Sequence, residues 1–334
     1  MLPLSILDLA PVPSGSTAGD ALRASVDLAR LAEALGYTRV WYAEHHGMPG
    51  IASAAPEILI AHTAAATERI RVGSGGMMMQ NHVPLKLAET FRTLEALYPG
   101  RIDLGIGRAP GTNPATSAAL RAFPPDAFAE QFAELTGLVG GRFPDGHPLA
   151  AITAVPADVP LPPMWLLGSS GASAAFAGAH GMGYAFASHF SPTPAAPAFE
   201  AYRAAFRPSE AFPAPHAILG AAVVCADTEA EADRLAASQD LVWVRLGRGE
   251  FGAFPRPEEA LAYPYTPHER ATADARRRLM VVGSPDSVRD RLAEMADAAG
   301  ADEVMLTTMT HDPAARLRSV RLVAEAFGLV GVTP

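Results

Sequence analysis

Short, β-prone apolar runs alternate along this chain with helical patterns, and glycine or polar residues stand where the runs end. Three of these runs end in Trp41–His46, Gly73–Met77 and Leu104–Arg108. Alternation of this kind predicts a parallel sheet with helices outside it. Since the active sites of β/α barrels lie at the carboxyl ends of the strands, residues at these ends are the candidates for function.

Eight strands in roughly 300 residues favour a (β/α)8 TIM barrel over the alternative, an open doubly wound sheet. We expect insertions after the fourth and seventh strands, at about 111–163 and 242–279, with a small hairpin in Phe143–Pro163. With no linker and no internal repeat, residues 1–334 are predicted to form one domain. The predicted strands are Pro3–Asp8, Arg39–Ala43, Ile70–Met77, Arg101–Gly107, Met164–Leu167, Gly183–Ala187, Ala217–Ala226 and Ala301–Thr307. The predicted helices are Asp20–Leu35, Pro56–Glu68, Pro84–Leu97, Ser170–His180, Ala195–Phe206, Thr228–Gln239, Pro285–Ala299 and Pro313–Phe327.

Composition and charge exclude several classes of protein. The 334 residues are 49% hydrophobic and carry 26 basic against 35 acidic side chains, a formal charge of −9, which argues against a nucleic-acid partner. No apolar stretch approaches the ~20 residues that cross a bilayer, no basic cluster suits a membrane surface, and the N-terminus lacks a signal peptide. The single cysteine, Cys225, lies in an apolar run and is predicted to be a small buried side chain. We therefore expect a cytoplasmic protein with no membrane partner.

The pair His45-His46 ends the second predicted strand. Because adjacent strand residues point to opposite sides, we expect one histidine to face the barrel mouth and the other a neighbouring loop. An imidazole there could give or take a proton near neutral pH. The alternative is a strand-end histidine that only satisfies backbone groups. No His-Glu-x-x-His helix or carboxylate triad accompanies the pair, so we predict no metal site.

The run Gly73–Gly76 lies inside a predicted strand, where glycine weakens packing. Glycines in that position mark a bulge, an unusual peptide geometry or the close approach of a ligand to the backbone. The methionines that follow, Met77–Met79, are either ordinary core residues or a soft wall against a flat ring.

An anion site is predicted from two further strand ends. Arg108 ends the fourth predicted strand, where a fixed cation suits a phosphate or carboxylate; the alternative is a salt bridge to Glu44 or Glu89. The loop Leu167–Ser173 lies between a strand and its helix, and its backbone amides and small hydroxyl side chains suit an anion. It is not a Walker loop, because the lysine is absent.

These residues, in this order, resemble the luciferase-like flavin monooxygenase family, in its branch with a single type of subunit. The resemblance covers nearly the whole chain and is strongest in Leu4–Pro11, Ala43–Pro49, Arg71–Gly76 and Pro99–Thr112. It implies a TIM barrel that binds reduced FMN at its mouth, with a flavin reductase as partner, and that uses dioxygen to oxidise a small organic substrate. It also implies a homodimer packed through the helices after the second and third strands, where Ala61 and Ala64–Ala66 offer a small-residue surface.

The resemblance also implies roles for single residues. His45 matches the family's important histidine, close to where dioxygen reacts, and is the expected catalytic residue. Gly75-Gly76 matches a non-proline cis peptide under the flavin ring. Arg108 matches a phosphate-binding arginine, and Ser169, Ser170 and Ser173 match the rest of the phosphate site. For the substrate pocket we expect Asp8, His46, Met77, Ser188 and His189, with further contacts from Phe251, Phe254 or Tyr263.

One departure from the family pattern limits the function. Bacterial luciferase has a reactive cysteine before the matching arginine, whereas this chain has Gly107, which speaks against light emission. The leading hypothesis is an FMN-dependent monooxygenase acting on a bulky apolar molecule. The alternatives are a hydride-transfer enzyme that uses the deazaflavin coenzyme, a non-catalytic flavin-binding protein, and a barrel enzyme that acts on a sugar phosphate without flavin.

Overall fold

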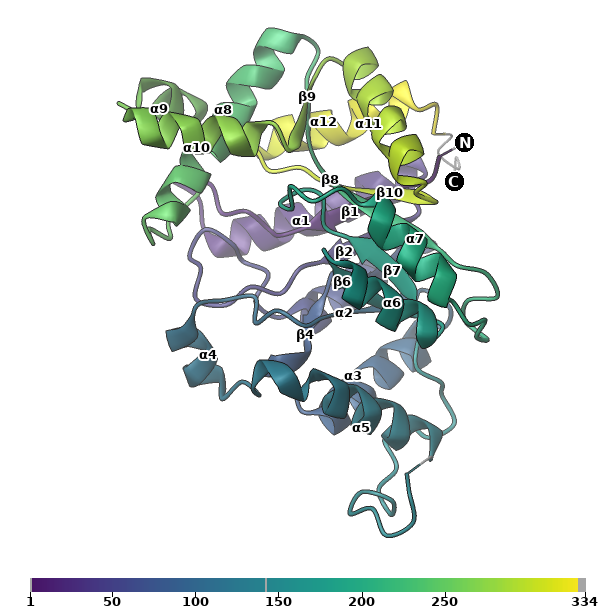
Figure 1. Ribbon diagram of the computed structural model, residues 1–334. Coiled ribbons are helices and arrows are strands. Elements are labelled where there is room, and N and C mark those ends of the chain that lie inside the picture. The colour runs from purple at the N-terminus through teal and green to yellow at the C-terminus, as the bar shows by residue number, and fades with distance from the viewer. Residues whose placement is uncertain (1, 142, 330–334) are drawn as a thin grey trace.

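A computed structural model describes residues 2–141 and 143–329. Its centre is a parallel sheet with helices around it (Figure 1). The strand order is β10-β1-β2-β3-β5-β6-β7-β8-β9, and β10 also pairs with β8, which closes eight positions into a barrel. This confirms the predicted TIM barrel over an open sheet. The strands are β1 (Leu4–Asp8), β2 (Arg39–Tyr42), β3 (Arg71–Ser74), β4 (Met77–Met78), β5 (Ile102–Gly107), β6 (Met164–Gly168), β7 (Gly183–Phe186), β8 (Ala217–Cys225), β9 (Met280–Gly283) and β10 (Glu303–Thr307).

The helices begin and end at residues that the sequence marks. A capping box of Thr17 and Asp20 starts the first helix, and Gly36, with a φ of 86°, ends it. Gly300 ends the helix Pro285–Ala299 in the same left-handed conformation. The helices are α1 (Ala18–Leu35), α2 (Pro56–Ala66), η1 (Met79–Asn81), α3 (Pro84–Leu97), α4 (Pro114–Leu120), η2 (Pro125–Ala127), α5 (Phe128–Gly140), α6 (Gly171–Ala179), α7 (Ala196–Ala205), α8 (Glu229–Gly247), α9 (Pro257–Ala262), α10 (Pro267–Arg277), α11 (Pro285–Ala299) and α12 (Pro313–Ala326).

The amino-terminal end of the barrel is filled by large side chains and closed by charges. Trp41 and Trp165 pack edge to face inside it, with ring centroids 5.4 Å apart. The Arg39 guanidinium lies 4.7 Å from the Trp165 ring and forms ion pairs with Asp103 and Glu303, which are fully buried. Because each buried charge has a partner, its desolvation is compensated, and this end of the barrel is sealed.

Four details of the predicted elements are wrong. The third strand is divided, because the chain turns through Gly75 and Gly76 between β3 and β4. Strand β9 was missed; it pairs with the second half of β8, which extends beyond its pairing with β10. Helix α8 does not stop at Gln239, because its apolar spacing continues to Gly247. Residues 143–163 contain no hairpin but turns and a cis Val155–Pro156 bond.

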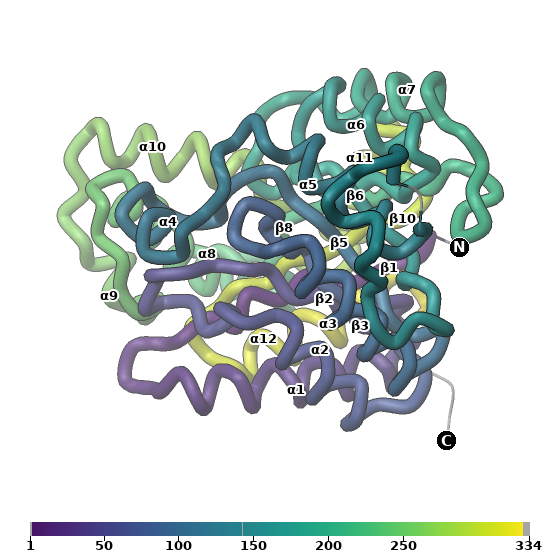
Figure 2. Tube along the Cα trace, turned by 90° about the horizontal axis from the view of Figure 1, so that it is seen from below, coloured from purple at the N-terminus to yellow at the C-terminus, as the bar shows by residue number. Residues whose placement is uncertain are grey.

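Two long connections lie beside the carboxyl ends of the strands. The connection from β5 to β6 contains α4, η2 and α5, and the connection from β8 to β9 contains α8, α9 and α10. Helices α4, α9 and α10 lie on the same side of the barrel in both views (Figures 1 and 2). No helix within the described residues is long and apolar enough to cross a membrane. Cys225 is buried, as predicted, and burial raises the pKa of its thiol to about 12.

Candidate active site

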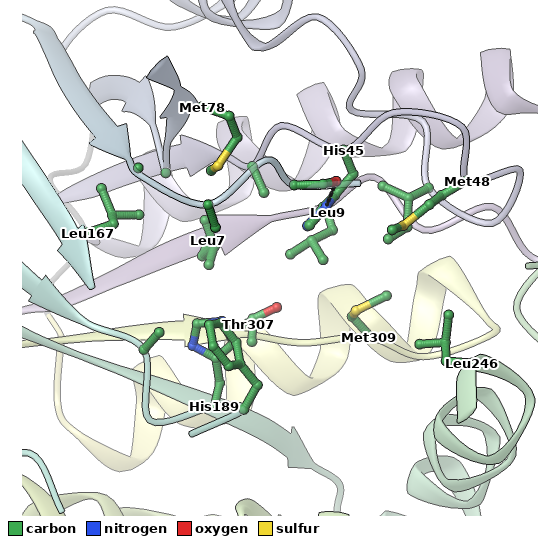
Figure 3. Close-up of a pocket in the computed structure, with 18 of the residues that line it drawn as sticks. Leu7, Leu9, His45, Met48, Met78, Leu167, His189, Leu246, Thr307 and Met309 are labelled. Carbon is green, nitrogen blue, oxygen red and sulfur yellow. Dashed lines mark hydrogen bonds between the residues drawn. The ribbon is translucent and has the colours of Figure 1, made fainter. Parts of the chain in front are cut away.

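A cavity of about 710 Å³ opens at the carboxyl ends of the barrel strands. Figure 3 shows side chains from opposite walls pointing into it, with His45 on one wall and His189 on the other. Residues from both long connections also line it. The cavity therefore lies where the strand-end residues predicted a site. The cavity lining includes Leu9, His45, Gly75, Arg108, Ser170 and Thr307.

The residues that were predicted to hold an anion, here called the anion end, belong to this cavity. Arg108, Ser169, Ser170 and Ser173 all line it. Ser170 precedes α6 but its side chain makes no capping hydrogen bond, so the first amides of this nine-residue helix are free for another acceptor. Ser173 Oγ donates to the Ser170 carbonyl at 2.8 Å, which fixes the turn.

The Arg108 guanidinium is available to a ligand. It forms no salt bridge with Glu44, Glu89 or any other carboxylate of the described residues. Its own backbone is held in place, because Gln80 Nε2 donates to the Arg108 carbonyl at 2.6 Å. A cation held by its backbone and left without a carboxylate partner suits a phosphate.

His45 faces the cavity and is held by one hydrogen bond. Its Nδ1 atom lies 3.0 Å from the Gly111 carbonyl oxygen, so Nδ1 carries the proton and Nε2 is an acceptor. Burial lowers the pKa of His45, which keeps the ring neutral near pH 7. The ring can therefore take up a proton at Nε2.

Glu44 joins the loops around the cavity, and the sequence pointed to it only as a possible partner of Arg108. This fully buried carboxylate accepts hydrogen bonds of 2.8 Å from His46 Nε2, His82 Nε2, Asn81 Nδ2 and the amide of Met78. Burial alone would raise the pKa of Glu44, but these donors outweigh it and hold the pKa below its ordinary value. The signal in the sequence was a glutamate directly before two histidines.

Four more hydrogen bonds join the same three loops, which follow β2, β4 and β5. Each uses a backbone carbonyl as the acceptor, so the loops are fixed by the main chain as well as by Glu44. The donor and acceptor pairs are Gln80 to Arg108, Asn81 to Pro110, Thr112 to His46 and His45 to Gly111.

The peptide bond Gly75–Gly76 is cis, as the resemblance implied. Gly75 lines the cavity, and a Cβ there would lie 2.5 Å from Leu7 Cδ1. Gly76 does not line it, and a Cβ there would lie 2.8 Å from the Gly105 carbonyl oxygen. Both positions therefore require glycine for lack of space, and Gly75 contributes backbone without a side chain to the cavity lining.

Four residues expected in the substrate pocket are not among those that line the cavity. Asp8 lies between Leu7 and Leu9, which do line it, and strand alternation turns its side chain the other way. There Asp8 Oδ1 accepts from Arg316 Nη2 at 2.5 Å. Met77 is likewise buried in the core beside Met78, which lines the cavity. His46 is turned to Glu44 by a hydrogen bond, and Ser188 lies in a turn whose next two residues, His189 and Phe190, line the cavity.

The rest of the cavity is mainly apolar and includes residues that the sequence did not point to. Phe251 and Phe254 line it, as expected, but Tyr263 does not. Residues 250–254 are fixed across the mouth, because the Phe254 amide donates to Val12 O at 2.7 Å and Ser14 N donates to Phe254 O at 2.8 Å. The additional apolar lining residues are Leu7, Leu9, Met48, Ile51, Val242, Trp243, Leu246 and Met309.

Comparison with known proteins places the chain among monooxygenases. Residues 2–303 match the family model described as luciferase-like monooxygenase. The luciferase-like monooxygenase of Escherichia coli (strain K12) is 42% identical over 324 residues, 96% of each chain. The N-acetyl-S-alkylcysteine monooxygenase of Bacillus subtilis (strain 168) is 34% identical over 334 residues, 98% of each chain. The crystal structure of apo-MsnO8 is 44% identical, with a TM-score of 0.90, over 99% of this chain and 100% of its own.

Proposed function

Because the chain belongs to the luciferase-like monooxygenase family, we propose that it uses reduced FMN and dioxygen to oxidise a small, mainly apolar organic substrate. A separate flavin reductase supplies the reduced FMN, by transient contact or by diffusion. One observation carries the proposal: an arginine with no carboxylate partner among the described residues and a helix start with no side-chain cap share one cavity with a half-buried histidine and an apolar wall.

The anion end of the cavity fits the FMN phosphate. Arg108 would pair with it, and Ser169, Ser170 and the first amides of α6 would donate to its oxygens. Gly75, which lines the same cavity as Arg108 and His45 and carries no side chain, would present its backbone to the flat ring system.

Reduced FMN, when bound, supplies the electrons that activate dioxygen, of which one atom enters the substrate and the other leaves as water. His45 accepts and returns a proton at Nε2, since its Nδ1–H is held by Gly111. Segment 250–254 and the apolar wall exclude bulk water from the reacting groups.

The apolar part of the cavity favours an apolar substrate of moderate size. Its lining consists mainly of leucine, methionine and aromatic side chains from α8, segment 250–254 and the strand ends. The relative named N-acetyl-S-alkylcysteine monooxygenase has a substrate name that combines an apolar S-alkyl group with a carboxylate. We therefore propose oxidation of a mainly apolar compound.

Cofactor binding separates this proposal from its alternatives. Protein free of cofactor is titrated with FMN, with reduced FMN under anaerobic conditions, and with the deazaflavin coenzyme. We expect the tightest binding for reduced FMN, and oxygen consumption that exceeds the flavin-only rate when a flavin reductase, NADH and an accepted substrate are added. Preference for the deazaflavin coenzyme would indicate hydride transfer, flavin binding with no turnover would indicate a binding protein, and no flavin binding would leave a sugar-phosphate enzyme.

A further inference from the structure

Gln239 is a nearly buried polar side chain in the cavity lining that has no hydrogen-bond partner within the described part of the chain. It is 7% exposed and lines the cavity. Neither Oε1 nor Nε2 is among the unpartnered polar atoms that the protein encloses completely, so the carboxamide can be reached from the cavity. Because an unpartnered polar group in a largely buried side chain is costly, it indicates a group that is bound beside it.

Helix α8 carries Gln239 on the face that it turns to the cavity. Gln239, Val242, Trp243 and Leu246 all line the cavity and follow the spacing i, i+3, i+4 and i+7 of one helix face. Figure 3 shows Leu246, the last of these four, at the cavity. Since the other three side chains are apolar, the carboxamide is the polar exception on this face.

Contacts on the other side of α8 hold the helix in this orientation. Asp240 accepts two hydrogen bonds from Arg277 of α10, at 3.1 Å from Nε and 2.6 Å from Nη2. Ala237 and Leu241 form a buried apolar cluster with Ala260 of α9. Figure 1 shows the three helices packed together. Because rotation of α8 about its axis would break both sets of contacts, Gln239 is held toward the cavity.

Gln239 belongs to a different part of the barrel from the anion end. Helix α8 follows β8, whereas Arg108 follows β5 and Ser169 follows β6. In the barrel, β7 lies between β6 and β8. Gln239 is therefore separate from the residues that would hold the FMN phosphate.

The surroundings of Gln239 suit an uncharged group. The carboxamide itself carries no charge, and Arg245, the cationic lining residue of α8, is paired with Glu259 at 2.5 Å. Glu250, which also lines the cavity, would repel an anion. A carboxylate buried beside Gln239 would find no free cation among the lining residues of α8, which is unfavourable.

We propose that Gln239 recognises an uncharged carboxamide group of an otherwise apolar substrate. The Gln239 side chain presents a donor, Nε2–H, beside an acceptor, Oε1. A primary carboxamide presents the complementary donor and acceptor on one edge, so two hydrogen bonds satisfy both polar atoms, whereas a ketone or an ether satisfies one. This inference rests on the proposed function, because it assigns Gln239 to the substrate and not to the flavin. It makes Gln239 a specificity-determining residue.

Three naphthalene probes of similar shape test the assignment in the protein saturated with FMN. They are 2-naphthamide, 2-naphthoate and 2-isopropylnaphthalene, which carry at the same position a carboxamide, a carboxylate and an apolar group. Isothermal titration calorimetry measures their binding. We expect the wild-type protein to bind 2-naphthamide at least tenfold tighter than 2-naphthoate, because the carboxylate would lose its hydration without gaining a cation.

Matched variants identify the group responsible. Gln239→Met keeps an unbranched side chain of similar length and removes both polar atoms. We expect it to weaken the binding of 2-naphthamide about tenfold, as for one to two neutral hydrogen bonds, and to change that of 2-isopropylnaphthalene less than about twofold. Ser238→Ala, at the preceding buried residue outside the cavity lining, should bind both probes as the wild type does. Circular dichroism shows whether each variant is folded.

Two outcomes would overturn the inference. In one, the wild-type protein does not bind 2-naphthamide, or Gln239→Met binds it equally well. In the other, Gln239→Met loses FMN affinity and weakens both neutral probes alike, so that the residue serves the flavin. If the protein binds no flavin, the same probes are measured without FMN; a loss confined to 2-naphthamide in Gln239→Met then supports the role of Gln239 although the proposed function has failed.

Discussion

His82 Nε2 lies 2.8 Å from Glu44 Oε2, although the two residues are 38 positions apart in the chain. The other oxygen of this carboxylate accepts from His46 and Asn81. One buried side chain therefore fixes the loop that carries His45 relative to the loop that follows the cis peptide. The arrangement makes Glu44 a positioning residue for the cavity, because it does not itself line it.

Glu44→Gln tests this positioning. The amide presents one oxygen and one NH2 group to four donors, so at least one donor loses its acceptor. We expect the free energy of unfolding to fall by about 2 kcal/mol and FMN affinity to fall about fivefold to tenfold. Urea unfolding and FMN titration at pH 7 measure the two effects.

The pH dependence gives an independent check on Glu44. Since the folded-state pKa of Glu44 is below its ordinary value, its stabilisation is present above the unfolded-state pKa and is lost as the pH falls through the folded-state pKa. The wild-type protein and Glu44→Gln should therefore converge in stability at acid pH. Glu68→Gln, at an exposed side chain, should match the wild type throughout, and equal stability of Glu44→Gln and wild type at pH 7 would contradict the role.

Arg108→Ala tests the phosphate site. Loss of a charge-assisted hydrogen bond should weaken the binding of reduced FMN by about 1–2 kcal/mol, with little change in stability because the guanidinium contacts no carboxylate of the described residues. Anaerobic fluorescence titration measures the affinity. Riboflavin, which lacks the phosphate, should bind wild type and variant alike; an unchanged affinity for FMN would remove Arg108 from the site.

His45→Ala separates chemistry from binding. Since Nε2 is proposed to act on a proton beside a bound flavin, turnover should fall by about a hundredfold or more, while FMN affinity changes by less than about threefold. His46→Ala, whose side chain is turned to Glu44, should instead lower stability. Normal turnover in His45→Ala would make its role structural.

Much of the cavity lining was predictable from single strand ends, and the errors within the strands have one physical origin. Short runs identified eight strands, and the residues after them identified Arg108, Ser170 and His45. Which of two neighbours faces inward depends on the register of the strand in the closed barrel, which the local pattern does not contain. For that reason Asp8 was predicted to face the cavity, whereas its neighbour Leu7 does.

Contacts between distant segments could not be predicted from the sequence. The acceptors of His46 and His82 depend on three loops meeting at Glu44. Strand β9 depends on the unpaired second half of β8.

The lowered pKa of His189 predicts that the stability of the protein depends on pH. Its pKa of about 4 in the folded protein lies below the ordinary value of 6.5, so the unfolded chain binds the proton more readily. Relative to His189→Leu, the wild-type protein should lose stability as the pH falls from about 6.5 to about 4, by at most ~1.4 kcal/mol per pH unit. Urea unfolding at several pH values measures the difference; a constant difference between the two proteins would contradict it, and exposed His268→Leu is the control.

The expected homodimer can be tested at the surface of α2 and α3. Ile58 on α2, Val83 just before α3 and Leu97 at its end are 66%, 57% and 63% exposed and are the large apolar side chains that a second copy could cover on these helices. If they pack against a second copy, Ile58→Glu should weaken the dimer at least tenfold, because a carboxylate would be buried at the contact. Light scattering over a concentration series measures the mass. Leu261→Glu, at a side chain that is 61% exposed on α9, should leave the mass unchanged, and a wild-type protein that is monomeric at all concentrations would refute the dimer.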